Sequence, residues 1–308
     1  MQYLFGPVPS RRLGMSLGVD LVPCKVCSLD CIYCQVGRTT QHTLERKSYV
    51  PIEPLITELN RFLGNPMHLD YITLSGAGEP TLNRDMGRLI RTIKQETSIP
   101  VALITNSTLF YREDVRQEAC LADLVIPSLD APDPKTFERI NRPVAGLTFE
   151  QVLEGLVLFS QGYQGRLWLE IFLIESINTH EHHIEQFRRC IQTIAPDRVQ
   201  LNTAVRPTAE DHIKALPHDQ MERIARMIGP DCEIVASAPN TTGVSHAAID
   251  EDRVLSMLRR HPCSMDQLCT GLGVHIEQAQ ALIDKLESQK KITSEKLGDG
   301  VFYRETTR

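Results

Sequence analysis

Hydrophobic and polar positions follow one another along the first three-quarters of the chain in a pattern that predicts strands and helices in turn. Ser16–Val22 is an apolar run that ends at Pro23, as expected of a buried strand. Residues 52–63 place apolar side chains three and four positions apart, the spacing of a helix with one buried face. By the same criteria we expect strands at 70–75, 101–105, 123–129, 167–174, 198–202 and 232–236, and helices at 84–96, from Thr148 onward, at 180–194 and at 218–228.

Strands and helices that alternate in this way form right-handed βαβ units around a parallel sheet. With about six units we expect an α/β protein, a partial (β/α)6 TIM-like barrel open on one side. In such barrels functional side chains gather at the carboxyl ends of the strands. Those positions hold a cysteine-rich loop after Val22, the Gly76–Glu79 loop, Asn106, Ser128, Asp130, Glu170 and Asn202.

The pattern changes after residue 237. Residues 238–247 are polar and contain Pro and Gly, which indicates a linker. Beyond it, 250–260, 264–272 and 275–289 have helical spacing, and 292–303 divides into two short strands across Gly298–Gly300. Three helices followed by a hairpin resemble a winged helix. We therefore expect a large domain at 1–237, the linker, and a small winged-helix domain at 248–308.

Composition and charge restrict the possible partners. The chain has 308 residues, 42% of them hydrophobic, and its 33 Lys and Arg against 39 Asp and Glu give a net charge of −6, which argues against polyanion binding through bulk charge. The first 47 residues carry a local excess of basic side chains, which could face a phosphate or only solvent. Residues 246–308 hold nine Lys and Arg against ten Asp and Glu, a balance that argues against DNA and favours contacts with protein, then RNA.

Four cysteines within eleven residues, Cys24, Cys27, Cys31 and Cys34, are too dense for packing alone. The last three have the spacing C-x3-C-x2-C, which lets one loop hold three corners of a [4Fe–4S] cluster and leaves the fourth iron open. Structural zinc sites normally pair two C-x2-C units across a longer gap, and a chain of this length needs no disulfide framework. A redox dithiol at Cys31 and Cys34 is disfavoured, because no thioredoxin-like sequence surrounds it. Cys120, Cys190 and Cys232 fit core thiols.

The cysteine loop, with Tyr33 before its last Cys, resembles that of the radical S-adenosylmethionine (radical SAM) superfamily. Leu74–Leu82, which contains Gly76-Ala-Gly-Glu-Pro80, is similar to the superfamily segment that holds the methionyl amino group. Residues 5–20, 127–130 and 141–143 resemble an uncharacterised Fe–S oxidoreductase group related to wyosine tRNA synthase. The resemblance covers roughly residues 1–240.

The resemblance implies a role for each candidate residue. Glu79 would bind the ammonium group of S-adenosylmethionine, beside Gly76 and Gly78, where the backbone can approach the ligand closely. Asp130 would bond a ribose hydroxyl, although its position equally fits a turn or helix cap. Glu170 either lines the barrel or pairs with a cation such as Arg206. The full set of expected cofactor contacts is Tyr33, Gly76, Gly78, Glu79, Asn106, Ser128, Asp130, Glu170 and Asn202.

The implied activity is reductive cleavage of S-adenosylmethionine to a 5′-deoxyadenosyl radical that modifies a macromolecule, either tRNA or protein. An electron donor such as flavodoxin or ferredoxin would be needed. The N-terminus lacks a signal peptide and no apolar run reaches membrane-spanning length, so we expect a cytoplasmic protein without membrane contact. The second cluster and the pyruvate-binding lysine of wyosine synthase are not locatable in the sequence.

Two other functions stay open. A glycyl-radical activating enzyme would suit a single cluster and a protein-binding C-terminal module. An iron–sulfur redox regulator with a DNA-binding winged helix would not need the Gly76–Glu79 loop. Nothing in the sequence specifies the substrate.

Overall fold

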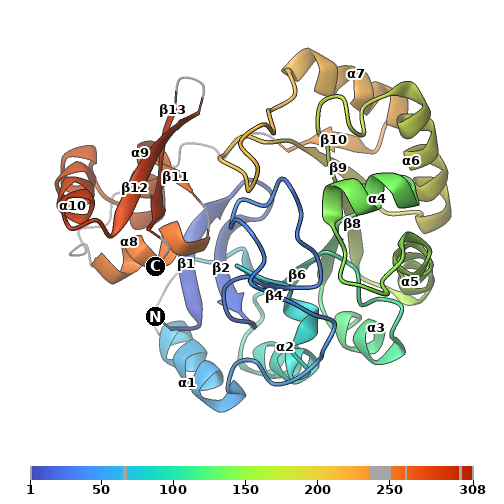
Figure 1. Ribbon diagram of the computed structural model, residues 1–308. Helices are drawn as coiled ribbons and strands as arrows, with labels where there is room; N and C mark the ends of the chain where they lie inside the picture. Colours follow the sequence, from blue (N-terminus) through green and yellow to red (C-terminus); the bar gives the residue numbers. More distant parts are fainter. Residues whose placement is uncertain (1, 65–67, 236–250, 261, 298–299, 307–308) are drawn as a thin grey trace.

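The computed structural model describes residues 2–64, 68–235, 251–260, 262–297 and 300–306. Its main element is an eight-stranded sheet in the order β1-β2-β5-β6-β7-β8-β9-β10 (Figure 1). Strand β1 is antiparallel to β2, and all other neighbours are parallel, as the alternating pattern predicts. The strands are β1 (Leu4–Ser10), β2 (Gly14–Asp20), β5 (Tyr71–Ser75), β6 (Val101–Thr105), β7 (Leu124–Pro127), β8 (Arg166–Phe172), β9 (Arg198–Asn202) and β10 (Cys232–Ile234).

Helices cover the outer face of this curved sheet (Figure 1). Each turns an apolar face inward; α2, for example, buries Met86, Leu89, Ile90 and Ile93. Helix α5 begins as expected, because Thr148 and Gln151 form a reciprocal capping box. The helices are α1 (Ile52–Leu63), α2 (Met86–Glu96), α3 (Glu113–Ala119), α4 (Pro134–Asn141), α5 (Phe149–Gly162), α6 (Glu181–Ile194) and α7 (His218–Ile228).

Strand β1 of the main sheet and helices α3 and α4 around it were not expected from the sequence. Strand β1 contains Gly6, Pro7 and Pro9, which are unfavourable in most strands. It lies at the edge of the sheet, where a missing backbone N–H is tolerated. Helices α3 and α4 have only seven and eight residues, so few positions reveal their apolar spacing in the sequence.

Residues 251–306 form a smaller unit with its own apolar core around Val254, Leu268, Ile283 and Leu286. Its elements follow the order helix, strand, helix, helix, strand, strand, and its three strands pair as β11-β13-β12. The expected linker at 238–247 and the turn at 298–299 lie outside the described residues. The elements are α8 (Glu251–Arg260), β11 (Cys263–Ser264), α9 (Met265–Leu272), α10 (Ile276–Ser288), β12 (Ile292–Leu297) and β13 (Gly300–Glu305).

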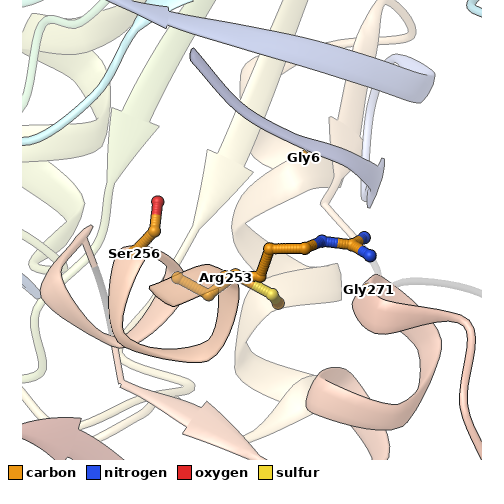
Figure 2. Close-up of a pocket in the computed structure, with 5 residues that line it drawn as sticks. Gly6, Arg253, Ser256 and Gly271 are labelled. Atoms are coloured by element: carbon orange, nitrogen blue, oxygen red, sulfur yellow. The ribbon is translucent and has the colours of Figure 1, made fainter. Parts of the chain in front are cut away.

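The C-terminal unit packs against strand β1, beside which it lies in Figure 1. Figure 2 shows Gly6 of β1 opposite Arg253 and Ser256 of α8 and Gly271 of α9, which line a small cavity at this junction. Arg260 extends from α8 to the main sheet, where its Nε donates to Asp20 Oδ2 at 2.8 Å. Its guanidinium also lies 4.4 Å from the centre of the Phe5 ring. An ion pair and a cation–π contact therefore attach the unit to the sheet.

Among the described residues, none of the helices combines the length and the apolar character needed to cross a bilayer.

Candidate functional site

Cys27, Cys31 and Cys34 line one cavity of about 190 Å³ at the carboxyl ends of the strands. The loop that carries them is shaped by short-range backbone bonds: Cys34 N donates to Cys31 O at 3.1 Å, and β3 (Val26–Cys27) pairs with β4 (Gln41–His42). The other expected residues on this cavity are Gly76, Gly78, Glu79, Asn106 and Ser128. Cys24 is exposed and lines a different cavity, against the C-terminal unit.

The thiols of this loop are partly buried, and two side-chain amides approach them. Burial, and secondly the nearby Glu79, raise the pKa of Cys27 to about 12. Burial also raises the pKa of Cys31 and of Cys34. Asn106 Nδ2 lies 3.4 Å from Cys27 Sγ, and Asn141 Nδ2 lies 3.3 Å from Cys31 Sγ. A thiolate at these positions needs a cation or metal to compensate its charge, which a metal cluster provides.

A cluster and a single metal ion need different arrangements of their ligands. Within the described residues, no group of three or more His, Cys, Asp or Glu side chains converges as ligands of one metal ion would. A zinc ion needs all its ligands about 2 Å from one centre. In an iron–sulfur cube the cysteines bind different iron atoms and stand farther apart. That the three thiols hold a cluster, as their C-x3-C-x2-C spacing indicates, stays a prediction.

Glu79 is 2% exposed, and both its oxygens accept hydrogen bonds from the protein. Oε1 accepts from Thr81 N at 3.0 Å and from the hydroxyls of Thr81 and Thr105 at 2.6 Å, and Oε2 accepts from Asn106 N at 2.8 Å. Burial raises the pKa of Glu79, and these hydrogen bonds act in the opposite direction. The carboxylate thus holds the loop after β5 against the end of β6. Its expected contact with an ammonium group stays a prediction.

The two glycines of this loop allow its backbone to approach its neighbours. Gly76 has φ +129°, and a Cβ atom there would lie 1.8 Å from Asp20 Oδ1. A Cβ atom at Gly78 would lie 2.4 Å from Val26 O. Because Val26 adjoins Cys27, the absence of a side chain at Gly78 brings this loop and the cysteine loop together.

Tyr33 and Asp130 connect the cysteine loop to β8. The Tyr33 hydroxyl donates to Asp130 Oδ2, and its ring stacks on Phe172 at 3.9 Å between centroids. Asp130 also accepts from Phe172 N at 2.9 Å and from Asn141 Nδ2 at 3.2 Å. Burial raises the pKa of Asp130 to about 6. Asp130 does not cap a helix, since Asp133 caps α4, and its expected bond to ribose stays a prediction.

Glu170 and Asn202 belong to a separate polar group. The sequence leaves open whether Glu170 lines the barrel or pairs with a cation such as Arg206, and in the structure it pairs with Arg12. Asn202 Oδ1 accepts from Arg11 Nη1 at 3.3 Å. The sequence signal for these arginines was only the basic excess of the first 47 residues. Among the other cysteines, Cys190 is buried and Cys232 partly buried, but Cys120 is exposed because it ends a short surface helix.

Comparison with known proteins identifies the family. The radical SAM superfamily model matches residues 21–188. The UPF0026 protein MJ1312 of Methanocaldococcus jannaschii is 33% identical over 313 residues, which cover 98% of this chain and 96% of that protein. A protein of Brachyspira hyodysenteriae named GTPase Obg is 37% identical over 303 residues, but this chain spans only 45% of its length. No glycine of the present sequence is followed by lysine, so the phosphate loop of P-loop GTPases is missing from it.

Solved structures show the same fold. A structure of TYW1 with a lysine–pyruvate adduct superposes with a TM-score of 0.54 at 20% identity, covering 73% of this chain and 75% of that one. A radical SAM methyltransferase from Sphaerobacter thermophilus gives 0.55 at 15% identity, covering 71% and 65%. The chain therefore has the α/β fold with a mostly parallel sheet found in these enzymes. It belongs to the radical SAM superfamily, whose enzymes use a [4Fe–4S] cluster to cleave S-adenosylmethionine reductively, and within it to the UPF0026 proteins.

Proposed function

We propose that Cys27, Cys31 and Cys34 hold one [4Fe–4S] cluster, that S-adenosylmethionine binds beside it, and that the protein modifies a macromolecular substrate. One observation carries this proposal: the three thiols and the Gly76–Glu79 loop line the same cavity. The two segments are far apart in the sequence, and the parallel pairing of β2 with β5 brings their ends together. A redox regulator would need the thiols but not the loop.

When bound, the cluster and S-adenosylmethionine supply one electron and a 5′-deoxyadenosyl radical. The chain's own part is to bind, orient and exclude water. The Asn106 and Asn141 amides point N–H donors at two of the sulfurs, which favours their thiolate forms. The Gly76–Glu79 loop would offer its backbone to the methionyl end of the ligand, and Ser128 lines the same cavity.

The finer description of the fold is part of the same proposal. The eight strands would form a partial barrel, since the described residues leave β1 and β10 as unpaired edges. The element order of residues 251–306 and their three-stranded antiparallel sheet support a winged helix. Its balanced charge favours a role in substrate presentation or protein contact over DNA binding.

The proposal is tested by anaerobic reconstitution with iron and sulfide, followed by reduction in the presence of S-adenosylmethionine. We expect 5′-deoxyadenosine by chromatography, and its loss in Cys27→Ala, Cys31→Ala and Cys34→Ala. Cys24→Ala is the matched control, because Cys24 is exposed and outside the cavity. A cluster that forms but never cleaves S-adenosylmethionine with a competent reductant would refute the radical SAM activity and favour an iron–sulfur redox regulator.

The substrate is tested in a second step. Transfer RNA and candidate proteins are added in turn, and each is analysed by mass spectrometry after turnover. A modified tRNA or protein identifies the macromolecule, and a glycyl radical detected by electron paramagnetic resonance on a protein would favour an activating enzyme. An electron donor such as flavodoxin or ferredoxin replaces the chemical reductant in the same assay.

A further inference from the structure

Three arginines gather beside the candidate cluster site. Arg11 and Arg12 lie in the turn between β1 and β2, and Arg206 follows β9 by four residues. Their partners are Asn202 for Arg11, Glu170 for Arg12, and Gln35, the residue after Cys34, for Arg206. Two distant segments thus bring three guanidinium groups together, and the Arg206 bond to Gln35 connects them to the cysteine loop.

The charges in this group do not balance. Arg12 forms an ion pair with Glu170 in which each side chain is 13% exposed. Arg11 Nη1 donates to the neutral amide of Asn202 at 3.3 Å, and Arg206 Nη1 to the neutral amide of Gln35 at 3.4 Å. Among the described residues, one of the three cations has a carboxylate as its hydrogen-bond partner and the other two have amide oxygens, although Glu170 also attracts Arg11. Long bonds to neutral acceptors compensate a guanidinium poorly.

Arg206 is the least satisfied of the three. Its Nε is buried and has no hydrogen-bond partner in the part of the chain that the structure describes. Burial also lowers the pKa of Arg206, and burial with repulsion from Arg206 lowers the pKa of Arg11 to about 10. A partly buried charge whose hydrogen-bond partner is a neutral amide is costly in a finished structure. A bound anion would compensate the charge of the Arg206 guanidinium and remove this cost.

We propose that Arg11 and Arg206, with Arg12 beside them, bind a phosphate group of the substrate. The inference rests on the proposed function, because it places the anion next to the cysteine loop through Gln35. Phosphate fits better than a single carboxylate: it can carry two charges, and its several oxygens can accept from more than one guanidinium fork. The substrate class is therefore a nucleotide or an RNA, and not an acidic peptide.

The negative charge of the whole chain does not oppose this proposal. Net charge governs long-range attraction, whereas a partly buried group of cations acts at short range and is weakly screened by salt. The site would hold one phosphate in place and would not by itself attract long polyanions. The net charge of −6 is therefore compatible with a short-range site for one phosphate.

The binding test uses the reconstituted protein under anaerobic conditions. Its thermal unfolding is followed at increasing inorganic phosphate, with ionic strength kept constant by chloride. We expect the melting temperature to rise with phosphate concentration, as for any ligand that binds only the folded state. Arg11→Gln and Arg206→Gln should each weaken phosphate binding at least tenfold, and Arg206→Lys should bind with intermediate affinity. The matched control is Arg189→Gln, an exposed arginine of α6 whose ion pair with Glu185 lies within its own helix.

Several results would overturn the inference. These are an unchanged melting temperature of the wild-type protein, an equal phosphate response in wild type and both arginine variants, or an equal response to acetate. If Arg206→Gln does not fold, the phosphate responses of Arg206→Lys and Arg11→Gln still test the inference. Adenosine monophosphate and a short single-stranded RNA then separate the two sources of phosphate, and binding of an acidic peptide instead of either would refute the assignment.

The outcome is independent of the test of the proposed function. Phosphate binding without formation of 5′-deoxyadenosine would support the phosphate site and refute the proposed radical SAM activity. Formation of 5′-deoxyadenosine without phosphate binding would support the proposed activity and refute the phosphate site.

Discussion

Asn106 and Asn141 show at the scale of single residues how the fold adjusts the chemistry of the thiols. Asn106 follows β6, and its amide donates both to Ser28 Oγ at 2.9 Å and toward Cys27 Sγ. Asn141 ends α4, and its amide lies between Cys31 Sγ and Asp130. Hydrogen bonds to ligand sulfurs stabilise negative charge and raise the reduction potential of an iron–sulfur cluster.

The first prediction concerns Asn141→Leu. Removing a hydrogen bond worth about 1 kcal/mol to the more negative, reduced cluster should lower its potential by roughly 40 mV for one electron. A redox titration followed by electron paramagnetic resonance measures the change. Asn60→Leu, at an exposed position on α1, is the control and should leave the potential unaltered. An unchanged potential in Asn141→Leu would mean that the amide does not reach the sulfur.

The residue scale also shows what the sequence could predict. The three cysteines and Gly76, Gly78 and Glu79 were identifiable because each set lies in one short segment. Asn141 meets Cys31 across 110 positions, and Arg12 meets Glu170 across 158. No local pattern encodes such a pair, so the choice of Arg12 over Arg206 appears only when the sheet is formed. The expectation that Cys120 is buried failed for a similar reason, since α3 is too short to define a buried face.

At the scale of elements, long helices and buried strands were predictable, and the edge of the sheet was not. The expected helix at 52–63 matches α1, and the expected strands at 101–105 and 198–202 match β6 and β9. Strand β1 lacked a clear strand signal, yet it pairs with β2 and lays Phe5 over Gly18, where a Cβ atom would lie 1.9 Å from the ring. Packing and pairing outweigh local preference at this edge.

The second prediction tests the contact between the Gly76–Glu79 loop and the cysteine loop. In Gly78→Ala the new methyl group would meet Val26 O at 2.4 Å and Val22 Cγ2 at 2.6 Å, so one loop must move. We expect iron and sulfide per protein to fall by at least half after reconstitution. Gly162→Ala at the end of α5 meets no atom within 4 Å and should keep full iron content and be neutral or about 0.5 kcal/mol more stable. Full iron content in Gly78→Ala would show that the loops need not touch.

At the scale of the whole molecule, the C-terminal unit and the sheet meet close to the cysteine loop. Arg260 is the last residue of α8, and Asp20 is the last residue of β2, four positions before Cys24. The Arg260 side chain is 8% exposed and that of Asp20 17%, so their ion pair is largely removed from water. Removing one partner of a buried pair leaves the other charge uncompensated.

The third prediction compares two adjacent arginines. Arg260→Gln should lower the free energy of unfolding by about 3 kcal/mol, because Asp20 stays buried without its cation. Arg259→Gln breaks an ion pair with Glu305 that is confined to the C-terminal unit and in which Arg259 is 55% exposed, so it should cost at most about 1 kcal/mol. Urea unfolding of the protein without metal measures both. Equal costs would mean that the Arg260 pair adds nothing beyond a surface contact.

The fourth prediction follows from the sign of the Asp20 shift. Burial raises the pKa of Asp20 above its ordinary value, although Arg260 acts in the opposite direction. The folded protein therefore takes up a proton at a higher pH than the unfolded chain, and stability rises as pH falls from the raised pKa toward the ordinary one. Arg260→Gln removes the nearest cation, so the pKa of Asp20 should rise further and protonation should relieve more of the cost. The free energy of unfolding that Arg260→Gln loses relative to wild type should therefore become smaller from pH 8 to pH 5.

The control is the same substitution in the Asp20→Asn protein. No carboxylate titrates at position 20 there, so Arg260→Gln should lower the free energy of unfolding by the same amount at pH 8 and at pH 5. A deficit that stays constant or grows toward pH 5 would show that the stability lost with Arg260 comes from its contact with Phe5 and not from the charge of Asp20.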